Sequence, residues 1–333
     1  MQTFAVIIGI NKYFYEQHLH GATGDAERFA ECLRSSLQVP TENMIVLLDA
    51  AATRDEILKS LHTHLRDNDR IHRGDAIVIY FAGHGTLYET HVRKPMEAIM
   101  PVDSGLELPD GTHIVDISDR QINLFLKELY DAKGENITVI MDCCYSAGCS
   151  RDGSSRHDQV TVRSRPSLQF TYQDLIDAAE ADKWKRWSPG SATDSVYQPY
   201  EESHMLLAAC CSNEKAYEDG EEGVFTRRLL QMLNSHSLNS ITYQELEDYM
   251  NHGSVTHRQC PVVVGRHKTS RIFRIGHPLS SGSGVGIETG GSTNLGSSTS
   301  SGGQGWLQRS VVRTGTWIRL NILSYAFWPK RRQ

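Results

Sequence analysis

Short runs of β-branched and aromatic residues alternate with segments of helical periodicity along the first part of the chain. The apolar runs predict strands at residues 4–10, 44–48, 75–81 and 137–141, with a shorter one at 98–100. Apolar positions at helical spacing predict helices over 25–37, from a capping box at Thr53, and from a cap at Ser118. Alternation of strand and helix is typical of a parallel sheet that helices cover on both faces.

The pattern changes after residue 150 and recovers near residue 204. Polar residues dominate 151–203, with one helix predicted at 171–184, and this composition favours an exposed insert. A strand follows at 204–209, then helices at 224–233 and 242–250, and then closing strands or a hairpin edge at 262–264 and 272–275. The sequence therefore predicts a large region at 1–150, the insert at 151–203, and a small region at 204–275 that completes the same domain.

The last part of the chain differs from both regions. Residues 276–305 are mostly Gly, Ser and Thr, which predicts a flexible linker. Residues 306–333 mix tryptophans and other apolar residues with arginine and lysine. Such a segment could lie on a membrane surface or bind a partner protein, but it lacks the roughly 20 continuous apolar residues of a membrane-spanning helix.

Composition narrows the function classes. The 333 residues carry a net charge of −6, which argues against a general nucleic-acid binder. Seven cysteines without a small-domain spacing do not predict a disulfide scaffold, so a reducing cytoplasm or nucleus is expected. The apolar start of the chain is short and has no basic leader, and it is interpreted as the first core strand rather than a signal peptide.

Two predicted strands end at residues capable of catalysis. The run 77–81 leads to Gly83-His84-Gly85, and the run 137–141 leads to Asp142-Cys143-Cys144. The functional crevice of an open parallel sheet lies beyond the carboxyl ends of its strands. If these strands are neighbours, an imidazole and a thiol can share a proton, which is the minimum apparatus of a cysteine nucleophile with a histidine base.

The motifs around this pair resemble those of the caspase/metacaspase clan of cysteine peptidases. The resemblance extends over about residues 4–275 and rests on four motifs: the start 4–13, the turn 19–26, Tyr80-Phe81-Ala82-Gly83-His84-Gly85, and Asp142-Cys143-Cys144-Tyr145-Ser146. The caspase Gln-Ala-Cys-x-Gly form is absent, so the chain is closer to metacaspases. The resemblance implies a three-layer α/β/α fold whose mostly parallel central sheet has about six strands.

The resemblance also implies roles for individual residues. Cys144 rather than Cys143 is the nucleophile, and His84 is its base. The oxyanion hole consists of the backbone N–H groups of Cys144 and Gly85. Loss of one such donor costs on the order of 3 kcal/mol.

The substrate pocket is expected to contain Asp25, Asp142 and Ala82. Two carboxylates in a small pocket favour a cationic side chain through charge-assisted hydrogen bonds. The predicted reaction is therefore hydrolysis of peptide bonds after Arg or Lys, and not after Asp. The resemblance also implies a role in proteolysis or programmed cell death.

Several positions depart from the family pattern. Tyr145 replaces a histidine, Ala147 precedes Gly148 where the glycine usually stands directly, and Ala22 replaces a pocket cysteine. These changes lie beside the nucleophile or the pocket and leave both catalytic groups in place.

Calcium is a candidate activator, and no other cofactor is implied. Asp103, Asp116 and Asp119 occupy the stretch where the family binds calcium. Arg120 interrupts the acidic pair, and a guanidinium is unfavourable among the six to eight oxygens that calcium takes. The identity of any metal ligand is left open.

The insert offers a site for self-processing, because an exposed basic segment is readily cut. A cut there would separate a fragment containing Cys144 from one that starts near Ser203, although a merely variable surface loop is an equal alternative. The basic residues concerned are Arg151, Arg156, Arg163, Arg165, Lys183, Lys185 and Arg186.

Two other functions compete with a peptidase. One is a catalytically weak caspase-like scaffold or signalling adaptor. The other is a nucleotide-binding α/β protein, which is disfavoured because the first strand is followed by neither a Walker motif nor a Gly-x-Gly-x-x-Gly.

Overall fold

A six-stranded sheet forms the centre of the protein. The computed structural model describes residues 1–88, 95–144, 160–166, 170–200, 202–210, 214–235, 241–252 and 259–274. The strands follow the order β13-β10-β7-β3-β1-β2. All neighbours are parallel except the edge strand β13, which is antiparallel to β10. Their bounds are β1 (Thr3–Gly9), β2 (Met44–Leu48), β3 (Ala76–Ala82), β7 (Ile137–Asp142), β10 (Met205–Ala208) and β13 (Val262–Val264).

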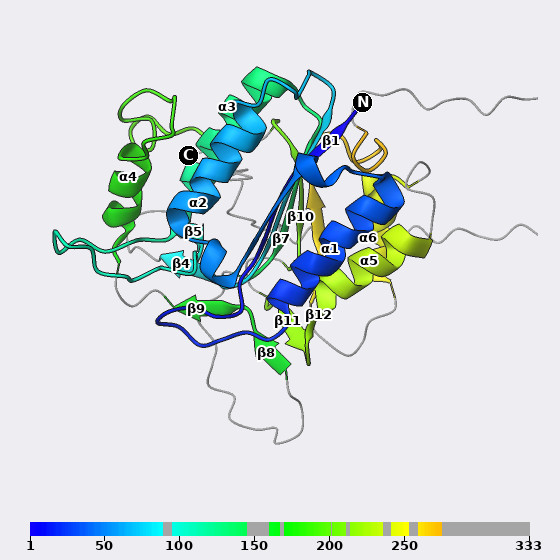
Figure 1. The fold of residues 1–333 in the computed structure, drawn as a ribbon, viewed down its shortest axis with the longest axis horizontal. Helices are drawn as coiled ribbons and strands as arrows, with labels where there is room; N and C mark the ends of the chain where they lie inside the picture. The colour runs from blue at the N-terminus through cyan, green and yellow to red at the C-terminus, as the bar shows by residue number, and fades with distance from the viewer. Residues whose placement is uncertain are drawn as a thin grey trace, which may run out of the picture. The chain divides into compact units, whose positions relative to one another are not determined.

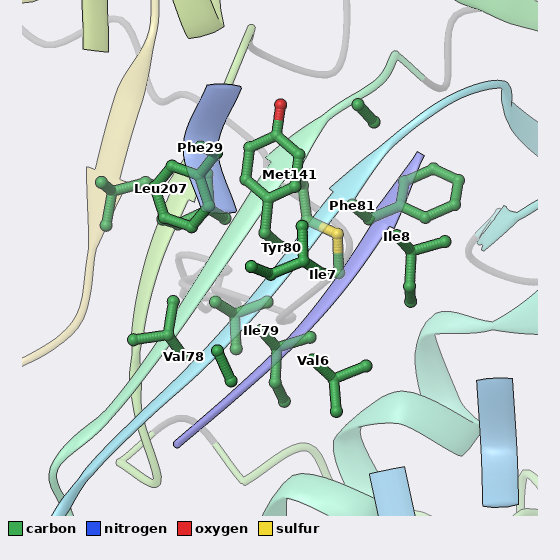
Figure 2. Close-up of a cluster of buried hydrophobic side chains, with 14 of the residues drawn as sticks. Val6, Ile7, Ile8, Phe29, Val78, Ile79, Tyr80, Phe81, Met141 and Leu207 are labelled. Atoms are coloured by element: carbon green, nitrogen blue, oxygen red, sulfur yellow. The ribbon is translucent and has the colours of Figure 1, made fainter. Parts of the chain in front are cut away.

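The central strands are mostly apolar because helices cover both faces of the sheet. Every residue of β3 and β7 is buried. Figure 2 shows side chains of β1, β3, β7 and β10 packed with Phe29 of α1 (Ala22–Leu37). The ring of Phe29 stacks on that of Tyr80 with 4.6 Å between centroids. Burial of this apolar surface is the main favourable term for the fold.

The helices form two layers (Figure 1). One layer contains α1, α5 (Val224–Ser235) and α6 (Tyr243–Asn251), and the other contains α2 (Arg54–Lys59), its π-helical continuation η3 (Ser60–Arg66) and α3 (Asp119–Lys133). The predicted caps form: the hydroxyls of Thr53 and Ser118 accept hydrogen bonds from the N–H groups of Glu56 and Gln121. None of the described helices is both long enough and apolar enough to cross a membrane.

Two small sheets lie beyond the carboxyl edge of the central sheet. The first has the order β6-β5-β4-β9, and the second has the order β12-β11-β8. A further helix, α4 (Tyr172–Glu180), contacts β6. The strands are β4 (Gly85–Tyr88), β5 (Met96–Ile99), β6 (Ile117–Ser118), β8 (Val160–Val162), β9 (Ser164–Pro166), β11 (Tyr217–Asp219) and β12 (Glu222–Gly223), and two 3-10 turns are η1 (Thr41–Asn43) and η2 (Asp49–Ala51).

The chain departs from the sequence expectation at the insert and at the closing strand. Part of the segment expected to be exposed is buried, because Arg163 is fully inaccessible and α4 buries Leu175 and Ile176 in a second apolar cluster. The closing strand expected at 272–275 is wrong for residues 272–274, because Ile272 and Phe273 lie in a turn where Phe273 has a positive φ of 60°. The predicted linker at 276–305 and the basic aromatic segment at 306–333 lie outside the described residues.

His204, just before β10, makes stability dependent on pH. Burial lowers the pKa of His204 to about 3. In the unfolded chain a histidine has a pKa of about 6.5, so it takes up a proton at a pH where His204 in the folded chain stays neutral. The free energy of unfolding therefore falls as the pH drops below about 6.5. Between pH 7 and pH 4, this group alone should lower the free energy of unfolding by about 3 kcal/mol.

A His204→Asn variant should therefore lose less stability than the wild type between pH 7 and pH 4, as measured by urea unfolding. Asparagine can keep the hydrogen bond that Nδ1 of His204 makes to the Ser203 hydroxyl. Burial raises the pKa of Asp116 to about 6 and that of Asp119 to about 7, which acts in the opposite direction in both chains and cancels in the comparison. Parallel pH profiles for the two chains would contradict this assignment.

Candidate active site

His84 and Cys144 lie at the same edge of the central sheet. Strands β3 and β7 are adjacent and parallel, and Ala82 pairs with Asp142 at their carboxyl ends. His84 lies two residues after Ala82, and Cys144 lies two residues after Asp142. The expectation that these two strands are neighbours is confirmed, and both residues are fully buried.

The ring of His84 is held with a defined tautomer. Its Nε2 lies 2.8 Å from the backbone carbonyl oxygen of Gln17. A carbonyl only accepts, so Nε2 carries the hydrogen and Nδ1 keeps the basic lone pair of the neutral ring. Tyr13 fixes the residue further: its ring lies 4.8 Å from the imidazole, and its hydroxyl accepts the backbone N–H of His84 at 2.7 Å.

Cys144 is a buried cysteine with a thiol neighbour that the sequence did not indicate. A hydrogen bond with the Cys144 thiol, together with burial, raises the pKa of Cys210, which follows β10. Cys143 is also buried. Three thiols therefore lie just beyond the carboxyl ends of the adjacent strands β7 and β10.

Asp25 and Asp142 line a buried acidic pocket, and the side chain of an arginine of the same chain fills it. Nη1 of Arg163 lies 2.8 Å from Oδ2 of Asp142, and Nη2 lies 2.5 Å from Oδ2 of Asp25. All three side chains are fully inaccessible to solvent. Glu218 on β11 adds a third carboxylate at 3.5 Å from Nη2. The pocket that the sequence predicts for a cationic side chain therefore contains one.

Further groups hold the pocket in shape. The Thr226 hydroxyl donates to Oδ2 of Asp142 at 2.6 Å, and the backbone N–H of Gly223 donates to Oδ2 of Asp25 at 2.8 Å. A Cβ at Gly223 would lie 2.6 Å from both of these carboxylate oxygens, so the pocket has room only for glycine there. Close approach of backbone to a charged group is a common reason for glycine.

The charges in the pocket depend on one another. Burial lowers the pKa of the Arg163 guanidinium, but the carboxylates of Asp142 and Asp25 outweigh burial and raise it above its usual range. Burial also raises the pKa of Asp142, an effect that the guanidinium opposes and the Asp25 carboxylate reinforces. The guanidinium is thus the compensating charge for the buried acids.

The backbone of Arg163 is hydrogen-bonded through both its carbonyl oxygen and its N–H. Its carbonyl oxygen accepts hydrogen bonds from the N–H of Gly85 at 3.1 Å and from the N–H of Cys144 at 3.2 Å. These are the two donors expected to form the oxyanion hole. The N–H of Arg163 donates to the carbonyl of Ala216 at 3.0 Å.

The residues on either side of Arg163 continue along two strands. The preceding residues of β8 pair antiparallel with β11, with Val162 opposite Tyr217 and Thr161 opposite Glu218. The following residues of β9 pair parallel with β4, with Ser164 opposite Gly85. Arg163 therefore lies in an extended segment that crosses the edge of the central sheet.

Other expected site residues have different surroundings. Ala82 is the last residue of β3 and pairs with Asp142, and its carbonyl accepts the N–H of Ile10. Tyr145 and Ala147 lie outside the described residues.

The aspartates expected near a calcium site do not converge. Asp103 accepts the N–H of Arg54, Asp116 accepts the hydroxyls of Tyr88 and Ser104, and Asp119 accepts the N–H of Arg120. No group of three or more acidic, His or Cys side chains within the described residues could hold a metal ion. These aspartates therefore do not fit a calcium site.

Several functional residues could not be recognised in the sequence. Gln17 acts through its backbone carbonyl, and Gly223 acts through the absence of a side chain. Glu218 has no motif around it. The run Val160-Thr161-Val162 before Arg163 is a short strand signal inside a polar segment, and it is the one local clue to the occupant of the pocket.

Comparisons with known proteins agree with this architecture. The Caspase domain family, peptidase family C14, matches residues 2–273. Metacaspase-4 of Arabidopsis thaliana is 28% identical over 166 residues, which cover 48% of this chain and 37% of that protein. Metacaspase-1A of Aspergillus oryzae is 28% identical over 174 residues, which cover 49% of this chain and 39% of that protein. The match thus spans about two fifths of the length of these relatives.

The fold is similar to that of a protein from Geobacter sulfurreducens whose crystal structure is known. The TM-score is 0.57 at 16% identity, and the match covers 82% of this chain and 97% of the other. The family match extends over the central sheet, the buried acidic pocket and the strand ends that bear His84 and Cys144. On this evidence the chain belongs to the caspase domain family of the C14 peptidases.

Proposed function

We propose that this protein is a cysteine endopeptidase that hydrolyses peptide bonds after Arg or Lys. Cys144 is the nucleophile, and His84 is the general base. The observation that carries the proposal is the position of Arg163, whose side chain fills the acidic pocket while its carbonyl accepts from Gly85 and Cys144. A peptide held in this manner presents the bond after its arginine to the nucleophile.

The geometry supports a two-step acyl transfer. Nδ1 of His84 takes the thiol proton as the Cys144 sulfur attacks the carbonyl carbon of the substrate. The N–H groups of Gly85 and Cys144 stabilise the oxyanion, and the imidazolium gives its proton to the leaving amine. Water then hydrolyses the thioester with the imidazole again as base, which restores the thiol.

The pocket favours arginine over lysine. Asp25 and Asp142 each pair with a different guanidinium nitrogen of Arg163. A lysine has one ammonium group and cannot present two separate nitrogens to the two carboxylates. An aspartate substrate would add a negative charge among three carboxylates. The expected order of cleavage is Arg, then Lys, with no cleavage after Asp.

A panel of fluorogenic peptides that differ only at the residue before the cut bond tests this proposal. The wild type should release the fluorophore from the Arg and Lys peptides, and Cys144→Ala should release none. The same assay in the presence of calcium or a chelator shows whether calcium activates the protein. A correctly folded wild type that cleaves no Arg peptide under either condition would favour the adaptor alternative. A site of action in the cytoplasm and a role in cell death stay predictions of the family resemblance.

Tyr13 acts as a positioning residue for the base. A Tyr13→Phe variant removes the hydroxyl that accepts the buried N–H of His84 but keeps the ring against the imidazole. An unsatisfied buried donor costs about 1–3 kcal/mol, which allows the loop bearing His84 to shift. We expect kcat for the Arg peptide to fall about tenfold while KM stays nearly constant. An equal rise in KM would instead indicate damage to the substrate pocket.

A further inference from the structure

We propose that Glu218 is a positioning residue that distinguishes arginine from lysine in the acidic pocket and transmits the difference to His84. The inference rests on the proposed function and adds the residue that sets the preference between the two cations. Asp25 and Asp142 supply the charge that binds either cation. Glu218 differs from them because its carboxylate also bonds to the end of the segment that holds the base.

One oxygen of Glu218 contacts both the cation in the pocket and the chain beside it. Oε2 lies 3.5 Å from Nη2 of Arg163 and accepts the backbone N–H of Gly21 at 3.1 Å. Oε1 accepts the backbone N–H of His20 at 2.8 Å. The side chains of Glu218 and Arg163 are buried, so solvent screens their attraction only weakly. The guanidinium and the backbone at 20–21 therefore share one carboxylate.

Gly21 lies directly against the guanidinium. A Cβ at this position would lie 3.1 Å from Nη2 of Arg163 and 3.0 Å from backbone atoms of Glu221 and Glu222, which connect β11 to β12. A side chain would press on all of these groups, and glycine permits the close approach. The backbone before α1 is thus packed against the cation that the pocket holds.

The segment that ends at Gly21 is a loop whose two ends are joined. The N–H of Leu19 donates to the carbonyl of Asn11 at 2.9 Å. The side-chain amide of Asn11 donates in turn to the carbonyl of His20 at 3.1 Å. A compact loop with joined ends moves largely as one unit, so a shift at its end is carried to the residues between 11 and 20.

That loop fixes the catalytic base. The carbonyl of Gln17 accepts from Nε2 of His84, and the hydroxyl of Tyr13 accepts the backbone N–H of the same histidine. A continuous series of hydrogen bonds therefore leads from the guanidinium through Glu218 and the loop to the imidazole. Small misplacements of a catalytic group have large effects on rate, so this series can control kcat.

Arginine and lysine differ in their reach to Glu218. The guanidinium presents Nη1 to Asp142 and Nη2 to both Asp25 and Glu218. A lysine ammonium ends one bond short of Nη2 and offers no second nitrogen. Glu218 then loses its partner, and the loop loses the charge that holds the carboxylate in place. We expect a lysine peptide to lose mainly in kcat, because its reacting bond meets a less well aligned base.

Steady-state kinetics of two fluorogenic peptides, identical except for Arg or Lys before the cut bond, test the inference. In the wild type, kcat should be about tenfold higher for the Arg peptide. Glu218→Gln should lower kcat for both peptides, because an amide cannot accept both loop N–H groups, but further for Arg. The ratio of the two kcat values should fall to about two. A merely structural role would lower both values by the same factor and leave the ratio unchanged.

Glu222→Gln on β12 is the matched control. The Glu222 side chain is 40% exposed and lies 3.8 Å from Arg28, which is equally exposed, so the loss of this ion pair should leave the ratio at its wild-type value. Glu218→Asp keeps the charge but withdraws it by about 1.5 Å, the length of one carbon–carbon bond. It should also lower the ratio, and it provides the test if circular dichroism shows that Glu218→Gln does not fold.

The outcomes separate the inference from the proposed function. A wild type with equal kcat for the Arg and Lys peptides would overturn the role of Glu218, whatever the variants do. An unchanged ratio in a folded Glu218→Gln or Glu218→Asp would overturn it as well, and both results leave the proposed function standing. Absence of hydrolysis of either peptide by the wild type would contradict the proposed function itself.

Discussion

Replacing Cys144 by alanine is expected to abolish hydrolysis of Arg peptides, whereas replacing Cys143 by alanine should leave most of the activity. Both cysteines follow β7 and both are buried, so burial does not separate them. The backbone N–H of Cys144 donates to the carbonyl oxygen of Arg163, which places Cys144 beside the carbonyl of the residue that fills the acidic pocket. Loss of a nucleophile lowers kcat by a factor on the order of 10⁴ or more.

Steady-state kinetics of the two variants, with circular dichroism to confirm folding, checks this prediction. Truncation of a buried thiol leaves only a small cavity, so both variants should unfold at nearly the wild-type denaturant concentration. Equal loss of activity in a folded Cys143→Ala variant would mean that the two adjacent thiols act together or that the motif assignment is wrong.

An Asp142→Asn substitution is expected to reduce kcat/KM for the Arg peptide by at least about 100-fold. Asp142 is fully buried, and its Oδ2 accepts from both Arg163 and the Thr226 hydroxyl. The amide removes the negative charge and places a donor group against a guanidinium. Loss of one partner of a buried ion pair costs about 3–5 kcal/mol, so the intact chain should also become less stable.

Peptide kinetics and urea unfolding measure the two effects of Asp142→Asn. Asp219 on β11 provides a control, because its side chain is 53% exposed and pairs at 3.5 Å with Arg227, which is also accessible to solvent. Exposed ion pairs contribute only about 0–1 kcal/mol, so Asp219→Asn should change neither quantity appreciably. If Asp142→Asn kept the wild-type kcat/KM, Asp142 would not bind the substrate side chain, and the proposed preference for basic residues would be contradicted.

Much of the central sheet follows from local sequence. The runs at 44–48 and 262–264 form strands with the predicted bounds, and the strands predicted at 4–10, 75–81 and 137–141 differ by a residue at their ends. Strands buried on both faces are continuous apolar runs, and such runs are visible without knowledge of their partners. Thr53 and Ser118 cap their helices as expected, because capping involves residues only a few positions apart.

The short strands beyond the sheet edge were harder to recognise. β4, β8, β9, β11 and β12 have between two and four residues each, and the pairing of β8 with β11 and of β4 with β9 joins segments far apart in the chain. Strand preference is weak without a partner, since it reflects packing against neighbouring strands. The closing strand expected at 272–275 is wrong for the residues that the structure describes. Ile272 and Phe273 are buried there, but they lie in a turn and not in a strand.

The sequence by itself determined which chemical groups meet at the end of the sheet. His84, Cys144 and Asp142 follow apolar runs, and parallel strands deliver their carboxyl ends to one edge. Only the tertiary structure decided what fills the acidic pocket. The polar composition around Arg163 favoured exposure, yet its guanidinium is buried because carboxylates from α1, β7 and β11 converge on it. A buried charge is stable only where opposite charges surround it, and that condition depends on segments far apart in the chain.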